Sequence, residues 1–229
     1  MKRIVATCCV TVLGLSCVLA QDPKVAQPTT IQSARLPAPA AFEGPRFTLQ
    51  FMGGYYAYTG LGPGAPFGST VDPNFDYAPI NIRVGYLLTS PSDRNFLLRG
   101  VGEILVDVMV APVTKGYADI VVGPSILLRY NFVQPNATLV PYIQGGAGFV
   151  YSDAYKTDGQ DALGEAVEFI LQCQVGVRWM LAANWSLDFE GGFQHISNAG
   201  FADRNGGVND VGGSVGFTYY LPHFGRGCR

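Results

Sequence analysis

The strongest constraint on the fold of this chain is a repeated alternation of apolar and polar side chains. In residues 78–88, for example, Ile82 and Val84 alternate with Asn81 and Arg83. Successive side chains of a β-strand point to opposite faces, so this period of two predicts a strand with one apolar face. The pattern recurs in eight segments, namely residues 47–58, 78–88, 96–108, 118–131, 139–151, a segment that ends near 180, 185–197 and 207–221.

The polar face of these segments carries charges of both signs, although charged residues make up only 14% of the chain against 48% hydrophobic residues. These charges are Arg83, Arg99, Glu103, Asp107, Asp119, Arg129, Arg178, Asp188 and Glu190. Paired charges suit the polar interior of a membrane barrel whose apolar face meets lipid. A soluble β-sandwich or lipocalin-like barrel, the alternative, would turn its aliphatic face inward around charges that it could not bury. We therefore predict an all-β fold, an eight-stranded antiparallel transmembrane β-barrel of the bacterial outer membrane.

Segment lengths and connections agree with such a barrel. No run of about 18 apolar residues occurs from Phe47 to Leu221, which excludes membrane-spanning helices, whereas a tilted strand crosses a bilayer in about 9 to 11 residues. The connections alternate between short turns near Pro91, Pro135 and Ala183 and long loops. Short turns are typical of the periplasmic side and long loops of the outer side.

The chain divides into four parts. Lys2 and Arg3 precede an uncharged stretch and a small-residue cleavage site, which predicts a signal peptide over residues 1–20. Residues 21–46 are rich in Pro and Ala and read as an extended or poorly ordered arm. The barrel is expected over residues 47–221 and a C-terminal tail over residues 222–229.

Composition excludes several classes of partner. A net charge of −2 provides no basic field for nucleic acid. The two histidines have no Cys or His at zinc spacing, so we expect neither a metal site nor another cofactor. Only Cys173 and Cys228 lie beyond the predicted signal, which rules out a disulfide scaffold. The barrel is expected to contact outer-membrane lipids as a monomer or a weak oligomer such as a homodimer.

Residues 185–197 contain the one group of side chains in which chemistry is expected. His195 and Ser197 fall on the same face as Trp185 and Phe193, where unpartnered polar groups are costly in lipid. Residues two apart on a strand are neighbours, so His195 can act as general base for the Ser197 hydroxyl. Spacing alone leaves open that both side chains lie above the apolar belt, solvated by water and headgroups.

A third residue is expected to orient the imidazole. The last strand offers Asn209 and Asp210, and parity places Asn209 on the face of His195 and Asp210 inside the barrel. An amide can fix a histidine tautomer, although it cannot stabilise the imidazolium as a carboxylate does. The nearby carboxylates Asp188 and Glu190 are interpreted as structural ion pairs, with catalysis as the alternative.

The run Phe193-Gln194-His195-Ile196-Ser197-Asn198-Ala199-Gly200, followed by Asn205, Gly207 and Asn209, resembles the signature of the outer-membrane lipid A 3-O-deacylases, the PagL-like acyloxyacyl hydrolase family. The resemblance covers about 30 residues near the C-terminus and is architectural elsewhere. It implies an eight-stranded barrel whose lipid-facing site removes the ester-linked acyl chain at position 3 of lipid A. Lipid A would then be both the substrate and the binding partner.

The resemblance also implies roles for single residues. Ser197 would be the nucleophile and His195 the base, while Asn205 and the Gly200 N–H would stabilise the oxyanion. Asn209 stands where the family has Glu. This substitution is compatible with a working Ser-His-Asn site, a slower enzyme or an inactive barrel, and Asp203 is another candidate for the third position. The rival functions are a non-enzymatic adhesin or structural barrel and a palmitoyl transferase, which would bind acyl chains inside.

Overall fold

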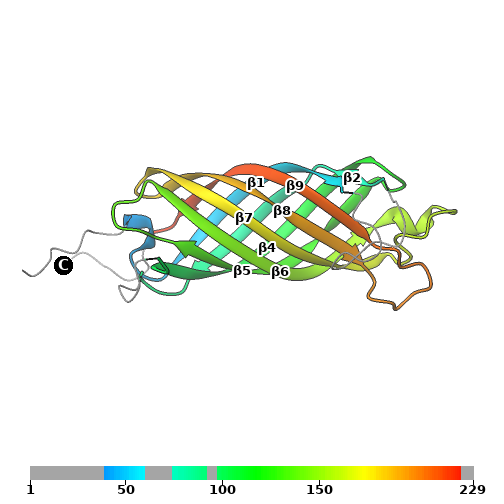
Figure 1. Ribbon diagram of the computed structural model, residues 1–229, viewed down its shortest axis with the longest axis horizontal. Coiled ribbons are helices and arrows are strands. Elements are labelled where there is room, and N and C mark those ends of the chain that lie inside the picture. Colours follow the sequence, from blue (N-terminus) through cyan, green and yellow to red (C-terminus); the bar gives the residue numbers. More distant parts are fainter. Residues whose placement is uncertain (1–38, 60–73, 92–96, 223–229) are drawn as a thin grey trace, which may run out of the picture. The chain divides into compact units, whose positions relative to one another are not determined.

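The computed structural model describes residues 39–59, 74–91 and 97–222, and the predicted signal peptide lies outside them. These residues form long tilted strands, which Figure 1 shows running the length of a barrel. The strands are β1 (Arg46–Tyr58), β2 (Asp76–Tyr77), β3 (Ile80–Leu87), β4 (Gly100–Lys115), β5 (Ile120–Phe132), β6 (Leu139–Ser152), β7 (Val167–Ala182), β8 (Trp185–Ser197) and β9 (Val208–Tyr220), with short 3-10 helices η1 (Ala40–Phe42) and η2 (Asp153–Lys156).

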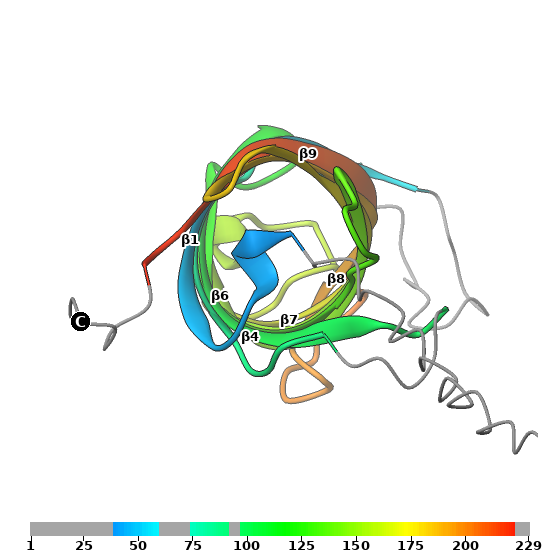
Figure 2. The ribbon, with the colours of Figure 1, turned by 90° about the vertical axis from the view of Figure 1, so that its left-hand side faces the viewer.

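The sheet is closed and antiparallel. Each long strand pairs with the next along the chain, and β9 pairs with β1 from Tyr220 opposite Thr48 to Asp210 opposite Tyr58. The two-residue β2 and the longer β3 both lie between β1 and β4, so they occupy one position in the wall. The barrel therefore has eight strand positions, as predicted, and its ring is visible end-on in Figure 2.

The predicted faces are confirmed along the strands. Large apolar side chains are exposed on the outer wall, and they include Ile82, Val84, Val106, Val108, Ile126, Leu128, Ile143, Val175, Phe189, Val215 and Phe217. The seven longest strands have 13 to 16 residues each, enough to cross a bilayer at a tilt. Among the described residues, no helix is long and apolar enough to span a membrane.

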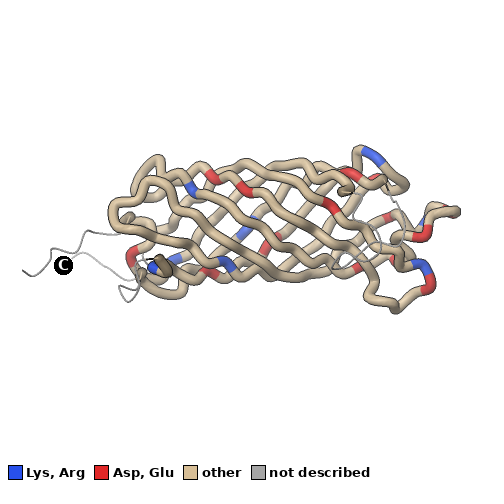
Figure 3. The backbone as a smooth tube through the Cα atoms, viewed as in Figure 1, with Lys and Arg blue, Asp and Glu red and all other residues tan. Residues whose placement is uncertain are grey.

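The barrel interior holds an ion-paired network. Arg83 contacts Glu190 at 2.8 Å and Asp107 at 3.2 Å, and Arg178 contacts Glu103 at 3.0 Å. All are almost completely buried, and pairing offsets the cost of removing each charge from water. Figure 3 shows charged positions along the strands as well as in the loops. The prediction that Asp119 joins this interior is wrong, because it is exposed in the connection before β5 begins at Ile120.

Apolar clusters close both ends of this interior. At the end with the short turns, here called the periplasmic end, η1 lies across the opening (blue in Figure 2), and Phe42 packs on Tyr220 at 5.4 Å between ring centroids. Ala41 and Phe42 are buried there, so the last part of residues 21–46 forms a plug. At the opposite, outer end, a second cluster is formed by Tyr56, Phe75, Tyr77, Met109, Ala111, Val121, Val150, Ala154, Ala162, Leu163, Ile170, Ile196 and Val208.

Strand boundaries differ most in β4. The segment predicted over residues 96–108 extends instead from Gly100 to Lys115, while Phe96 lies outside the described residues. Pro112 resembles a strand breaker because it lacks an N–H donor. It is nevertheless accommodated opposite Ile120, and its carbonyl accepts a hydrogen bond from the Ala78 N–H at 3.0 Å.

Candidate active site

The β8–β9 pair brings the predicted site residues together at the outer end of the barrel. Ser197 is the last residue of β8, and His195 lies two residues before it on the same outer face. His195 pairs directly with Asn209 on β9, because the connection through residues 198–207 keeps the two strands in register. The neighbouring pair, Ile196 and Val208, points inward into the outer apolar cluster and anchors this register.

The three polar side chains form a hydrogen-bonded series. Nδ1 of His195 lies 2.7 Å from Oδ1 of Asn209, and Nε2 lies 2.9 Å from Oγ of Ser197. Since an amide oxygen only accepts, the Nδ1–H donates to Asn209, and in the neutral imidazole Nε2 then carries no proton. Nε2 can therefore accept the Ser197 hydroxyl proton, which is the arrangement that a general base requires.

Burial and a glycine hold the imidazole in place. Asn209 is completely buried, His195 is 9% exposed and Ser197 is half-buried. Gly207 packs beside the ring in a left-handed conformation with φ of 73°, and a Cβ at this position would lie 3.1 Å from Cε1 of His195. Gly207 therefore provides both the turn and the space that the imidazole occupies.

The loop after Ser197 is shaped by the side chain of Asn198. Its Oδ1 accepts the Gly200 N–H at 3.0 Å, and its Nδ2 donates to the Arg204 carbonyl at 2.9 Å. The Asn198 N–H donates to Oδ1 of Asn205 at 2.9 Å. Asn205 is thus held through its oxygen, so its amide nitrogen is the end that can donate to a bound group.

Other acidic candidates lie elsewhere. Asp203 is exposed in the loop, and Asp210 is buried on the opposite face of β9, as parity predicts. Glu190 is engaged by Arg83, Tyr142 and Gln144 inside the barrel. The described residues contain no group of three or more His, Cys, Asp and Glu side chains that could hold a metal ion.

A group of aromatic side chains begins next to Ser197 on the outer wall. Phe169 of β7 lies directly opposite Ser197, and its ring is 5.1 Å from that of Phe149 and 6.1 Å from that of Phe201. Phe201 is 80% exposed in the loop that follows Ser197. The polar group therefore opens onto an apolar surface.

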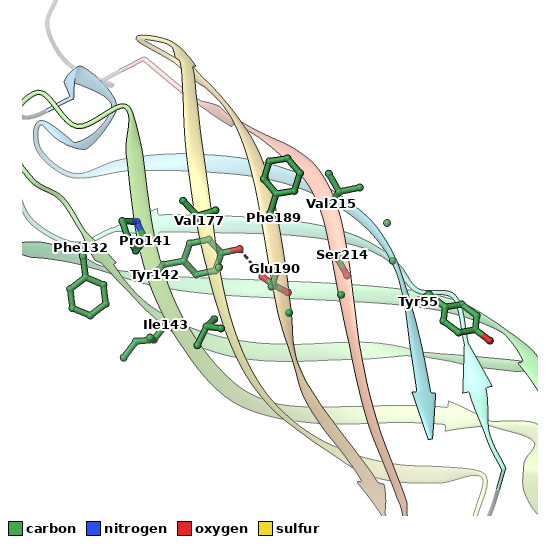
Figure 4. A pocket seen from close by; sticks show the side chains of 16 residues that line it. Tyr55, Phe132, Pro141, Tyr142, Ile143, Val177, Phe189, Glu190, Ser214 and Val215 are labelled. Atoms are coloured by element: carbon green, nitrogen blue, oxygen red, sulfur yellow. Dashed lines mark hydrogen bonds between the residues drawn. The ribbon is translucent and has the colours of Figure 1, made fainter. Parts of the chain in front are cut away.

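A larger groove crosses the same wall away from this group. It has a volume of about 860 Å³, and Figure 4 shows its lining residues, with Tyr142 hydrogen-bonded to Glu190 behind the wall. Gly191 and Gly213 face each other across β8 and β9 within it. Neither Ser197 nor His195 lines this groove.

Sequence reasoning missed two contributors to the site. Gly207 appears in the sequence analysis only as part of the family resemblance and as the start of a predicted strand, and its packing beside the imidazole was not predicted. The loop over residues 153–166, which binds the loop after Ser197, has no sequence signal, because the Arg204 contact joins residues 47 apart.

A closed β-barrel with an apolar outer wall and a buried charged interior defines an outer-membrane β-barrel, and this one carries a Ser, His and Asn group on its lipid-facing wall. The family described as lipid A 3-O-deacylase (PagL) matches residues 80–218. The chain belongs to this family.

Solved structures with similar folds are distant in sequence. The outer membrane enzyme PagL is 15% identical, with 75% of this chain and 99% of that chain covered and a TM-score of 0.48. Neisserial surface protein A is 15% identical, with 78% and 100% covered and a TM-score of 0.47. Outer Membrane Protein W of E. coli is 15% identical, with 78% and 99% covered and a TM-score of 0.42. Comparison with curated protein sequences gives no match.

Proposed function

We propose that this protein is an esterase that removes the 3-O-linked acyl chain from lipid A. The observation that carries the proposal is the contact between Nε2 of His195 and Oγ of Ser197, at 2.9 Å, on the lipid-facing wall of a barrel of the lipid A 3-O-deacylase family. Membership of the family supports the substrate. The geometry supports nucleophilic catalysis by a hydroxyl.

The proposed reaction proceeds through an acyl-enzyme. Oγ of Ser197 attacks the ester carbonyl carbon while Nε2 of His195 takes the hydroxyl proton. The tetrahedral intermediate collapses as its bond to the sugar oxygen breaks, and that oxygen receives the proton from His195. Water then attacks the acyl-serine with His195 again as base, which releases the fatty acid and restores Ser197. Asn209 keeps the Nδ1–H in place throughout.

Charge develops on the former carbonyl oxygen, and donors next to Ser197 would stabilise it. We assign this role to Nδ2 of Asn205, whose oxygen is already held by the Asn198 N–H. The Gly200 N–H is the second proposed donor. It is bonded to Oδ1 of Asn198 in this structure, so it must exchange that bond for one to the oxyanion.

The surroundings fit a substrate that lies in the membrane. Lipid A is expected in the outer leaflet, at the end of the barrel where β8 finishes with Ser197. Phe169 and Phe201 offer apolar surface for the acyl chain beside the nucleophile. A substrate chain can therefore reach Ser197 from lipid without entering the barrel interior, which is ion-paired and closed by clusters at both ends. This argues against a palmitoyl transferase with an internal acyl pocket.

Positional specificity tests the proposal. The refolded barrel would be incubated in detergent with lipid A that carries the 3-O-linked chain and with lipid A that lacks it, and the lipid masses followed. We expect loss of one acyl chain from the first lipid and no change in the second. Loss of a secondary or amide-linked chain would contradict the proposed bond, and two unchanged lipids would favour the non-enzymatic barrel.

A further inference from the structure

The loop that carries the proposed oxyanion donors is bound to a neighbouring loop. Both lie at the outer end of the barrel (right-hand end of Figure 1), one over residues 153–166 and the other over residues 198–207. Arg204 donates from Nη2 to the Tyr155 carbonyl at 2.8 Å and from Nη1 to the Thr157 carbonyl at 3.1 Å. These two bonds join the middle of one loop to the other.

Backbone bonds and close packing extend the contact. The Gly206 N–H donates to the Asp161 carbonyl at 2.7 Å, and the Gly207 N–H donates to the Ala162 carbonyl at 3.0 Å. Gly164 lies so close to Arg204 that a Cβ on it would stand 2.5 Å from the Arg204 carbonyl oxygen. The two loops therefore fit against each other along most of their length.

The supporting loop is itself braced internally by Gln160. Its Oε1 accepts the N–H groups of Ala162 and Leu163 at 2.9 and 3.0 Å, and its Nε2 donates to the carbonyls of Ala154 and Leu163 at 3.2 and 2.7 Å. Ala162 and Leu163 are buried in the outer apolar cluster. These contacts hold loop 153–166 in one conformation.

Asp153 ties the same loop to the wall. Its Oδ1 accepts the N–H groups of Asp119 and Ile120 at 2.9 and 3.2 Å, at the start of β5. Thr157 adds a bond from its hydroxyl to the Tyr117 carbonyl at 2.8 Å. Contacts with the connection between β4 and β5 thus limit how far the loop can move.

Two short series of contacts connect loop 153–166 to the candidate site. The Arg204 carbonyl accepts from Nδ2 of Asn198, which in turn orders Asn205 and Gly200. Gly207, held by the Ala162 carbonyl, packs beside the His195 ring. A displacement of loop 198–207 would therefore move the proposed oxyanion donors and the wall of the imidazole site together.

We propose that loop 153–166 is the support of the Ser197 site and that Arg204 is the positioning residue that joins them. The inference rests on the proposed hydrolase function of Ser197. Arg204 contacts neither the nucleophile nor the base, and it acts through Asn198 and Asn205. Its removal should therefore slow the chemical step more than it weakens substrate binding.

The test compares Arg204→Met, Arg204→Lys and Lys156→Met in the full chain, refolded in detergent. Lys156→Met is the matched control, since it removes one positive charge from the neighbouring loop without removing a bond to loop 198–207. A fluorophosphonate measures the reactivity of Ser197, because Oγ attacks phosphorus, fluoride leaves and the phosphonyl oxygen needs the same donors as the ester. Hydrogen exchange of peptides covering residues 200–207 reports the loop itself, and lipid A deacylation gives kcat and KM.

We expect Arg204→Met to lower the labelling rate and kcat by about 10- to 100-fold with KM changed less than about threefold, and to raise exchange in residues 200–207 by about tenfold. Arg204→Lys should recover part of each effect, and Lys156→Met should match the parent. Equal labelling and exchange in Arg204→Met and the parent would overturn the inference.

The outcomes separate this inference from the proposed substrate. A parent that reacts with fluorophosphonate and loses that reactivity in Arg204→Met, but leaves lipid A intact, would support the positioning role and contradict the substrate. A parent that is not labelled would contradict the nucleophile and the inference with it.

Discussion

Nδ1 of His195 lies 2.7 Å from Oδ1 of Asn209, directly across the β8–β9 pair. The amide fixes the tautomer in which Nε2 faces Ser197, yet it adds no negative charge beside the ring. The candidate site therefore has the orientation that a triad needs without the charge that would stabilise the imidazolium of the proposed attack.

Asn209→Asp tests the value of this missing charge. The replacement is nearly isosteric, so the carboxylate would meet Nδ1 at a similar distance and form a charge-assisted hydrogen bond. We expect kcat to rise about tenfold, equivalent to about 1.4 kcal/mol of transition-state stabilisation. Asn209→Glu should gain less, because its extra methylene must fit at a completely buried position.

Asn209→Ala is the complementary variant. Without the amide, the imidazole loses its orienting partner, and a small misplacement of a catalytic group costs roughly 100-fold in rate. Deacylation kinetics of the two variants, at matched folded fractions, check both statements. An Asn209→Ala enzyme as fast as the parent would remove Asn209 from the site.

The parity of a β-strand made this part of the site predictable. Because side chains alternate, Asn209 and Asp210 are predicted on opposite faces of the strand. Antiparallel pairing of the last two strands then places Asn209 near His195. The structure confirms both placements through the pair His195 and Asn209 and the burial of Asp210 on the inner face. Alternation is a local property, so it is visible without tertiary information.

Contacts between loops were not predictable in the same way. Arg204 and Tyr155 are 49 positions apart, and neither belongs to a periodic pattern. The predicted end of β4 was wrong for a related reason. Whether Pro112 can be accommodated within the strand depends on the residues that pair with it across the sheet. Loop contacts and strand ends of this kind depend on tertiary packing, which cannot be inferred from single residues.

Gly207→Ala should impair both stability and chemistry. The residue has φ of 73°, where an L-side chain costs about 1–2 kcal/mol, and its Cβ would press on Cε1 of His195 from 3.1 Å. We expect a lower urea midpoint of unfolding and a kcat reduced roughly tenfold by displacement of the ring.

Gly44→Ala is the control for backbone strain. Gly44 has φ of 86° and follows η1 at the periplasmic end, the end of the barrel opposite Ser197. It should lose comparable stability while the folded fraction keeps the parental kcat. Equal losses of kcat in the two variants would show that the contact with His195 does not matter.

Glu190→Ala tests the interpretation that the interior carboxylates form structural ion pairs and take no part in catalysis. Glu190 pairs with Arg83 at 2.8 Å and accepts hydrogen bonds from Tyr142 and Gln144, each at 3.0 Å. Removing it leaves a buried guanidinium without this partner, which should cost roughly 3–5 kcal/mol of stability. Urea unfolding measures this loss, and kcat of the folded fraction should stay near the parental value. A stable barrel with strongly reduced kcat would instead make Glu190 a catalytic group.

The most direct measurement is the mass of lipid A after incubation with the parent barrel and with Ser197→Ala, both shown to be folded by their strand content. We predict that the parent removes one 3-linked acyl chain and that Ser197→Ala is slower by about 10⁶-fold, so that its lipid stays intact. Removal of the chain at similar rates by both proteins would contradict Ser197 as the nucleophile, and intact lipid with both would contradict the deacylase.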